Sequence, residues 1–310
     1  MSKIIVVTPD SFGTERWRGV MQRAMPNHEV VAWQEGMGDT GAHYAVVWSP
    51  PEAFFLSQRH LKAIFNLGAG VDRILAAPGL PDIPIYRLED AGMAPQMAEY
   101  VIHSLSSVSR GFDDYRQTQG QAKWSAKHAT DYGEWPVGVM GMGKLGAHVA
   151  RAVGDLGYPV AGWARSPREI PGVQVFHGDS GLAAFLARTR VLVNLLPLTA
   201  ATRGIIDHEL LSALKPNAMV INIARGAHVV DDDLLAALDS GHVEAAVLDV
   251  FNEEPLPQGH PYWSHPKVRV TPHIAAITLE SEAARQISEG IARLERGEQA
   301  SGLVNRTTGY

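Results

Sequence analysis

The sequence contains no cysteine, which excludes a disulfide framework and every metal site that needs thiolate ligands. It also has no apolar run that approaches the roughly 18 residues needed to cross a bilayer. The N-terminal residues Met1, Ser2 and Lys3 lead straight into a short strand-like run, so no signal peptide is expected. We therefore expect a soluble, cytoplasmic protein that does not have a membrane as its partner.

An excess of basic residues is missing as well. The 310 residues include 27 Lys and Arg against 33 Asp and Glu, which leaves a formal net charge of −6. This balance gives no support to nucleic-acid binding, which would favour a basic face. The 13 histidines are scattered and form no tract, so no metal site is expected. The apolar fraction of 45% supplies ample material for a core, and the length suits two domains.

Short apolar runs alternate with polar or helical segments in the first third of the chain. They are rich in Val, Ile and aromatic residues, as is typical of parallel strands buried on both faces. We predict strands at residues 4–8, 30–33, 44–48, 63–67 and 83–88. Pro95 then opens a long helical pattern whose apolar face extends to Phe112, and residues 117–134 are predicted to be a connection.

A second alternation of strands and helices begins at Pro136, and this βαβ rhythm predicts a second doubly wound parallel sheet. We predict strands at 137–141, 160–163, 191–195, 218–223, 245–250 and 268–271, and helices at 144–156, 181–188, 207–214 and 232–239. The tail at 278–294 is predicted to be a further helix.

A glycine-rich turn joins the first strand and helix of this second alternation. Gly141, Gly143 and Gly146 form the pattern G-x-G-x-x-G. In this context the first glycine permits a tight turn, the second lets the backbone approach a pyrophosphate, and the third lets the helix pack closely on the strand. The helix N-terminus offers N–H groups and partial positive charge to the phosphates. The turn therefore predicts a dinucleotide site.

The end of the following strand bears on which dinucleotide is used. Enzymes that use NAD usually place an acid about 20 residues after the turn, where it accepts from the ribose 2′-OH. Here Ala164 stands in that region and is followed by Arg165, Ser166 and Arg168. Guanidinium groups match phosphate geometry, so we expect NADP(H) as the preferred cofactor and NAD(H) as an accepted alternative. The competing interpretation is a solvated loop with incidental arginines.

Charged side chains follow three later strands directly. Arg225 follows one, Glu253 and Glu254 come shortly after the next, and His273 follows the third. Ligands of open α/β sheets bind outside the carboxyl ends of strands. Reduction of a 2-oxo acid needs a cation for the carboxylate and carbonyl, and an acid near neutral pH beside a carboxylate, which Arg, His and Glu supply. Each residue alone is equally consistent with a structural ion pair.

Together these motifs resemble those of D-isomer-specific 2-hydroxyacid dehydrogenases, and within that family those of the glyoxylate/hydroxypyruvate reductase A group. The resemblance covers essentially the whole chain and is carried by residues 67–72, 141–146, 194–199, 222–226, 248–255 and 272–276. It implies that Arg225 binds the substrate, that His273 is the catalytic acid, and that Glu254, directly before Pro255, pairs with it.

The resemblance also implies the remaining contacts. The N–H groups of Ala69 and Gly70 would hold the substrate carboxylate, and Trp48 would line the pocket, although ordinary core packing explains Trp48 equally well. Cofactor contacts are implied for Gly141, Met142, Gly143, Lys144, Leu145, Leu196, Pro197, Ala224 and Asp249, the last near the nicotinamide carboxamide.

The implied architecture is a Rossmann-type cofactor domain inserted into a flavodoxin-like substrate domain. We expect residues 1–97 and 279–310 to form the substrate domain and 98–278 the dinucleotide-binding domain, with the site in a cleft that closes on substrate. A homodimer is implied by the family. The expected reaction is reduction of glyoxylate or hydroxypyruvate to glycolate or glycerate. Reduction of bulkier 2-oxo acids, and a dinucleotide-sensing module without turnover, are the alternatives.

Overall fold

The computed structural model describes residues 2–310 and divides them into two compact units. One unit comprises residues 2–92 and Thr278–Tyr310, and the other comprises Met93–Ile277. We had expected the chain to pass from the first unit to the second between residues 97 and 98. Helix α4 (Met93–Ser109) belongs to the second unit from its first residue, so the chain passes between the units before this helix. It returns to the first unit between residues 277 and 278, one position before the expected boundary at 278/279.

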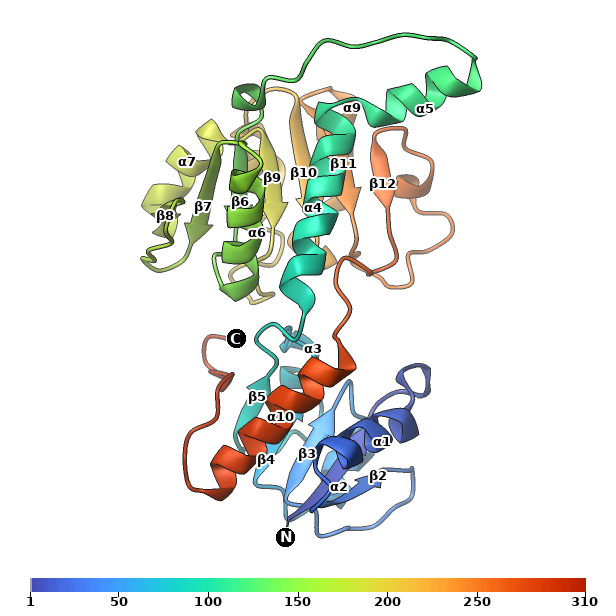
Figure 1. Cartoon of the computed structure of the whole chain (residues 1–310), viewed down its shortest axis with the longest axis vertical. Helices are drawn as coiled ribbons and strands as arrows, with labels where there is room; N and C mark the ends of the chain where they lie inside the picture. The colour runs from blue at the N-terminus through green and yellow to red at the C-terminus, as the bar shows by residue number, and fades with distance from the viewer. Residues whose placement is uncertain (1) are drawn as a thin grey trace. The chain divides into compact units, whose positions relative to one another are not determined.

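The first unit contains a five-stranded parallel sheet in the order β2-β1-β3-β4-β5, which is the flavodoxin-like order (Figure 1). The strands are β1 (Lys3–Val7), β2 (Glu29–Ala32), β3 (Tyr44–Val47), β4 (Ala63–Asn66) and β5 (Ile85–Arg87). Its helices are α1 (Thr14–Ala24), α2 (Glu52–Ser57), α3 (Asp72–Leu75) and α10 (Glu280–Glu295), with a 3₁₀ turn η1 at Asp10–Phe12. Helices α1 and α10 pack together, so the chain's tail covers the sheet that its beginning forms.

The second unit contains a seven-stranded sheet in the order β12-β11-β10-β9-β6-β7-β8, in which neighbouring strands run parallel. The strands are β6 (Val137–Met140), β7 (Val160–Ala164), β8 (Gln174–His177), β9 (Val191–Asn194), β10 (Ala218–Asn222), β11 (Val243–Leu248) and β12 (Val268–Val270). The order reverses between β6 and β9, as in a Rossmann fold, and the predicted pair of doubly wound parallel sheets is confirmed.

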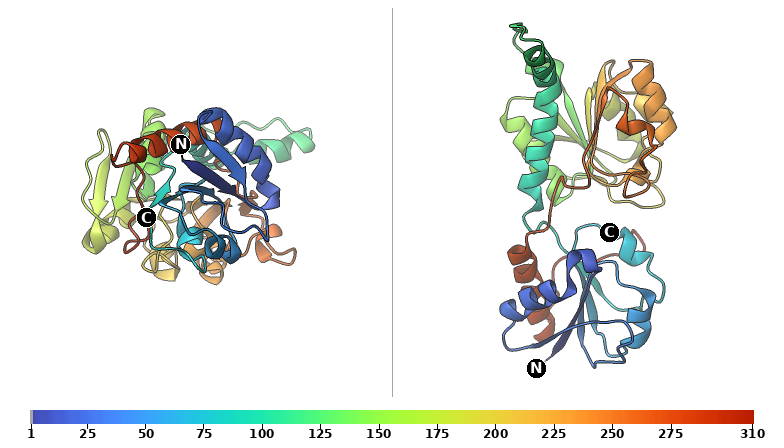
Figure 2. Two further views of the ribbon diagram at one scale, coloured as in Figure 1. Left: turned by 90° about the horizontal axis from the view of Figure 1, so that it is seen from below. Right: turned by 90° about the vertical axis from the view of Figure 1, so that its right-hand side faces the viewer.

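Helices cover both faces of this sheet (Figure 2). One face packs on α4 and α6 (Lys144–Asp155), and the other on α7 (Gly178–Arg188), α8 (His208–Ser212) and α9 (Asp231–Asp239). Successive residues of a strand point to opposite faces. Accordingly Val191 and Val193 of β9 join the core under α4, whereas Leu192 joins the core under α7. This is why the strands appear in the sequence as unbroken apolar runs.

Two elements differ from the sequence prediction. Phe112 does not continue the helix that precedes it, because Gly111 adopts a φ of 65° and a separate helix α5 (Phe112–Gly120) begins there. This helix includes residues 117–120, which we had predicted to be a connection. Strand β8 was not predicted, since its residues at the edge of the sheet are only partly buried and carry no clear apolar pattern.

Within residues 2–310, no helix combines the length and apolar character needed to cross a membrane.

Candidate active site

The glycine-rich turn lies between β6 and α6, as predicted. Gly141 has a φ of 98°, which favours glycine. A Cβ atom added to Gly146 would lie 1.9 Å from the Gly141 carbonyl oxygen, so the helix can approach the turn only because this residue is glycine. A Cβ atom at Gly143 would meet nothing within 4 Å, and no side chain caps the N-terminus of α6. The open backbone at Gly143 fits a pyrophosphate held by the N–H groups of this turn.

The neighbouring residues of the turn differ in what they present. The Met142 side chain is buried against Gly162 of β7, so only its backbone faces the turn. Lys144 is exposed and Leu145 half-buried at the start of α6. The predicted residues Leu196 and Pro197 lie beside the turn, because a Cβ at Gly141 would contact the Leu195 carbonyl. The structure thus brings the two predicted cofactor segments together.

The loop after β7 lies next to the glycine-rich turn. Ala164 is buried at the end of the strand, and Arg165, Ser166 and Arg168 are exposed. Arg168 Nη1 donates to the Met142 carbonyl over a long 3.4 Å contact. This contact holds one of the predicted phosphate-binding arginines at the turn that would carry the dinucleotide.

Arg225, Glu254 and His273 follow the neighbouring strands β10, β11 and β12, at the same edge of the sheet as the glycine-rich turn. Glu254 Oε2 lies 2.9 Å from His273 Nδ1, and Glu254 Oε1 accepts from the N–H of Phe251 at 3.1 Å. Both carboxylate oxygens are therefore oriented. The imidazole Nε2 has no partner among residues 2–310, and the side chain is 43% exposed. The pair can hold a proton at Nε2 for an incoming oxygen.

Arg225 follows β10 in an extended conformation, and its Nη1 donates to the Ala224 carbonyl at 2.7 Å. The next residue, Gly226, lies against the backbone of Phe251, because a Cβ added there would be 1.8 Å from the Phe251 carbonyl carbon. The Arg225 turn therefore packs directly on the segment that carries Glu254. The predicted cofactor residue Ala224 is buried within this turn.

The loop that presents His273 is held by a buried carboxylate. Asp249, only 1% exposed, accepts from Thr271 Oγ1 at 2.6 Å and from the N–H groups of Ile274 and Ala275, each at 2.8 Å. The Asp249 carbonyl accepts from the His273 N–H at 2.8 Å, which helps to hold His273 at a φ of 55°. The oxygens of Asp249 thus bind the loop that carries His273. The predicted place of Asp249 near the nicotinamide carboxamide stays a prediction.

In the first unit, Ala69 and Gly70 follow β4 and are half-buried. The buried side chain of Asn66, which ends β4, donates from Nδ2 to the carbonyls of Gly68 at 3.0 Å and Gly70 at 2.9 Å. This clamps the shape of the predicted carboxylate-binding loop. We had assigned no role to Asn66, although an Asn that ends an apolar strand is a polar group the fold must satisfy.

The Trp48 ring lies against this same loop. A Cβ atom at Gly68 would be 2.4 Å from the ring, so the close approach requires glycine. The Phe12 ring packs on Trp48 with centroids 5.6 Å apart, and Phe12 is 46% exposed. Trp48 is half-buried, and its place in the substrate pocket stays a prediction. Phe12 is a second candidate lining residue that the sequence pattern did not indicate.

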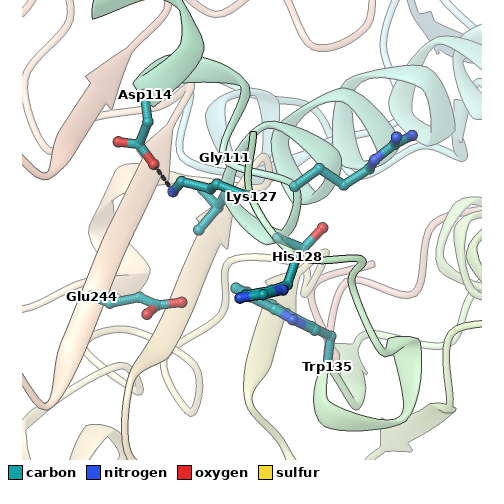
Figure 3. A pocket seen from close by; sticks show the side chains of 9 residues that line it. Gly111, Asp114, Lys127, His128, Trp135 and Glu244 are labelled. Atoms are coloured by element: carbon teal, nitrogen blue, oxygen red, sulfur yellow. Dashed lines mark hydrogen bonds and ion pairs between the residues drawn. The ribbon is translucent and has the colours of Figure 1, made fainter. Parts of the chain in front are cut away.

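A cavity of about 370 Å³ lies elsewhere in the second unit (Figure 3). Its lining includes Lys127, which forms an ion pair with Asp114, and His128, Trp135 and Glu244. Trp135 and Glu244 stand at the amino ends of β6 and β11, opposite the edge that carries His273. This cavity is therefore separate from the candidate active site.

The comparisons with known proteins agree with this geometry. Residues 102–275 match the model of the D-isomer specific 2-hydroxyacid dehydrogenase NAD-binding domain. A D-isomer specific 2-hydroxyacid dehydrogenase from Xanthobacter autotrophicus Py2, solved with NADPH and MES, is 39% identical with a TM-score of 0.94, covering 100% of this chain and 99% of that one.

Two further solved structures have similar coverage. The NADPH-dependent glyoxylate/hydroxypyruvate reductase from Sinorhizobium meliloti, solved with NADP and sulfate, is 36% identical with a TM-score of 0.94, covering 100% of both chains. A probable 2-hydroxyacid dehydrogenase from Rhizobium etli CFN 42, solved with NADP, HEPES and L(+)-tartaric acid, is 34% identical with a TM-score of 0.90, covering 100% of this chain and 99% of that one. The chain belongs to the D-isomer specific 2-hydroxyacid dehydrogenases, a family of NAD(P)-dependent oxidoreductases.

Proposed function

We propose that this enzyme is an NADPH-preferring reductase of small 2-oxo acids, with glyoxylate and hydroxypyruvate as substrates. The observation that carries the proposal is the His273–Glu254 pair, 2.9 Å apart at the edge of the sheet that also carries the glycine-rich turn. The similar reductase from Sinorhizobium meliloti acts on glyoxylate and hydroxypyruvate, as its name states. The bound dinucleotide would supply the hydride that reduces C2 of the oxo acid.

The chain's own residues bind the acid and move the proton. We assign the N–H groups of Ala69 and Gly70 and the guanidinium of Arg225 to the substrate carboxylate. Arg225 also stabilises the negative charge that grows on the carbonyl oxygen. Glu254 accepts from His273 Nδ1–H, which orients the imidazole so that Nε2–H is the proton donor to that oxygen.

The histidine assignment is tested by His273→Ala with His265→Ala as a matched control. His265 also pairs with a carboxylate, Asp239, at 3.3 Å, but it precedes β12 at the opposite edge of the sheet. We expect His273→Ala to lower kcat about 10²–10⁴-fold with the fold intact, because general acid catalysis contributes that much. His265→Ala should leave kcat unchanged. A folded His273→Ala enzyme with near-normal kcat would remove the assignment.

The cofactor preference depends on the loop after β7. We propose that Arg165, Ser166 and Arg168 bind the 2′-phosphate of NADPH, supported by the contact of Arg168 with the glycine-rich turn. Three of the similar proteins were crystallised with NADPH or NADP. Asp249, Leu196, Pro197 and Ala224 are proposed to line the rest of the dinucleotide site.

The double variant Arg165→Ala/Arg168→Ala tests this preference. We expect kcat/KM for NADPH to fall about 10–100-fold, since hydrogen bonds to charged groups are worth about 1.5–3 kcal/mol, while kcat/KM for NADH stays the same. Arg188→Ala is the control, because Arg188 is a partly exposed cation of α7 whose Nη1 donates to Gln174 Oε1. Equal use of NADH and NADPH by the wild-type enzyme would overturn the preference.

We also propose a homodimer formed through the cofactor domain. Helix α5 has no buried residue, residues 119–129 are all exposed, and Trp124 in this stretch is fully exposed. Figure 1 shows α5 and the following segment extending from the end of α4. A short helix with no buried residue is marginal in water, and a second copy would cover it. Sedimentation should give a dimer for the wild type and dissociation for Trp124→Ser; a monomeric wild type would contradict it.

A further inference from the structure

We propose that Asn194, Asn222 and His228 form a buried positioning network that fixes the two segments of the site next to it, the Arg225 turn and the Leu196–Pro197 segment. This inference rests on the proposed function, because it takes Arg225 as the residue that binds the substrate carboxylate. The three side chains are 0% exposed, and none of them has a role in the reaction as described so far.

The network begins where two strands end. Asn194 and Asn222 are the last residues of β9 and β10, and they face each other in the strand register. Asn194 Nδ2 donates to Asn222 Oδ1 at 3.0 Å and also lies 2.9 Å from His228 Nδ1. His228 ends the 3₁₀ turn at Gly226–His228, and its Nε2 lies 3.3 Å from the Pro197 carbonyl. Buried polar groups are almost always hydrogen-bonded, and these three side chains form hydrogen bonds with one another.

The donors and acceptors can be assigned from the network. Asn194 Oδ1 accepts from the Leu196 N–H at 3.2 Å, so the amide nitrogen must be the atom that faces Asn222 and His228. An amide nitrogen only donates, so His228 Nδ1 is an acceptor and carries no proton. The proton is then on Nε2, which donates to the Pro197 carbonyl. His228 is therefore a neutral imidazole in a single tautomer.

Each end of the network holds backbone of the site. Asn222 Nδ2 donates to the Arg225 carbonyl at 2.9 Å, and Asn222 Oδ1 also accepts from the Ala224 N–H at 3.2 Å, which closes the turn that presents Arg225. His228 and Thr202 Oγ1, the latter at 2.7 Å, both donate to the Pro197 carbonyl. A break at His228 would leave buried groups without partners and free both segments to move.

The consequence for the reaction is one of placement. His228 has no contact with substrate in this scheme, so it is a positioning residue. A displacement of about 1 Å of a group that holds the substrate can cost about 10²-fold in rate. We expect His228→Leu, which removes both hydrogen bonds, to lower kcat/KM for the 2-oxo acid about 10²-fold. His228→Gln, which keeps a donor near the Nε2 position, should restore part of this loss.

His242→Leu is the matched control. His242 Nε2 also contacts a carbonyl, that of Leu211, at 3.0 Å, but His242 lies just before β11 at the opposite edge of the same sheet. We expect His242→Leu to lower the melting temperature and leave kcat/KM unchanged. If His228→Leu and His242→Leu change kcat/KM equally, His228 is merely structural and the inference is overturned. Should His228→Leu fail to fold, His228→Gln and His228→Asn against His242→Gln give the same comparison.

A double-mutant cycle with Arg225→Ala identifies the residue through which His228 acts. If the network works by placing Arg225, most of the loss caused by His228→Leu disappears in the Arg225→Ala background, because the placed group is already gone. A loss that persists in full overturns the inference and leaves the proposed function standing. A near-normal kcat/KM for Arg225→Ala alone instead contradicts the proposed function, so the two failures are distinguishable.

Discussion

At the scale of single residues, the second unit repeatedly uses buried polar side chains to shape the loops that follow its strands. Asp249 holds the loop of His273, and Asn222 closes the turn of Arg225. In the first unit Asn66 does the same for the loop of Ala69 and Gly70. In each case the polar residue stands within or directly after an apolar strand, where the backbone leaves the sheet and loses its ladder partners.

Asp249→Asn is expected to disturb the His273 loop. The carboxylate accepts three hydrogen bonds, and an amide cannot accept on both atoms, so at least one buried N–H or O–H loses its partner. We expect a loss of about 1–3 kcal/mol in the free energy of unfolding and a lower kcat. Urea unfolding and steady-state kinetics measure the two. An unchanged kcat with normal stability would show that the carboxylate does not hold this loop.

Tyr100 links helix α4 to the same loop through a 2.6 Å hydrogen bond to Thr271, and burial raises the pKa of Tyr100 to about 12. The ordinary pKa of tyrosine is about 10. Because the pKa is raised in the folded state, Tyr100 contributes stability that is complete below pH 10 and is lost as the pH rises towards 12. The stability advantage of the wild type over Tyr100→Phe should therefore shrink between pH 9 and 11.5, as measured by urea unfolding. A difference that is independent of pH would contradict this.

At the scale of elements, the glycines of the glycine-rich turn have two different roles, one in packing the helix on the strand and one in leaving space for a ligand. Gly146 is required by packing, because any Cβ there would collide with the Gly141 carbonyl. Gly143 is not required by packing, because a Cβ there meets open space and its φ of −75° suits any residue. The fold therefore does not require glycine at residue 143, and we expect that the bound pyrophosphate does.

The variants Gly143→Ala and Gly146→Ala therefore form a matched pair. We expect Gly143→Ala to keep the wild-type stability to within about 1 kcal/mol and to weaken NADPH binding at least about tenfold. Gly146→Ala should lower the free energy of unfolding by several kcal/mol, as is typical of overpacked sites. Thermal unfolding and fluorescence titration with NADPH distinguish the two. A Gly143→Ala enzyme with unchanged NADPH affinity would mean that the pyrophosphate is not held at this turn.

At the scale of the whole molecule, the second unit is one continuous segment with its own sheet and two cores, one on each face. The first unit is built from both ends of the chain, so it is complete only when residues 278–310 are present. The second unit also holds the glycine-rich turn, the Arg165–Arg168 loop and the His273–Glu254 pair. It lacks the Ala69–Gly70 amides.

A fragment of residues 93–277 should therefore fold alone and bind NADPH. We expect cooperative urea unfolding, because the fragment keeps both cores, and an affinity within about tenfold of that of the full chain, a difference of about 1.4 kcal/mol. It should not reduce glyoxylate, because the amides assigned to the carboxylate are absent. A fragment that fails to fold, or one that turns over glyoxylate, would contradict this division of roles.

The sequence by itself determined the class of fold and the place of the glycine-rich turn, and it indicated candidate residues for the reaction. Strands buried on both faces are apolar along most of their length, so Ile4–Val7 of β1 and Val191–Val193 of β9 are visible as continuous runs. The turn is visible because backbone geometry at Gly141 and packing at Gly146 demand glycine. Arg225 and His273 were candidates because polar groups at strand ends gather at one edge of a parallel sheet, and the resemblance to the family distinguished Glu254 from Glu253.

Only the tertiary structure decided how these residues are held. Asn194 and His228 are 34 residues apart, and no periodicity connects a strand end with a later turn. Phe12 and Trp48 meet because β1 and β3 are neighbours in the sheet although β2 lies between them in the sequence. The edge strand β8 and helix α5 bury too little surface to leave an apolar pattern. Hydrogen bonds between side chains depend on the meeting of distant segments, and only the folded chain determines which segments meet.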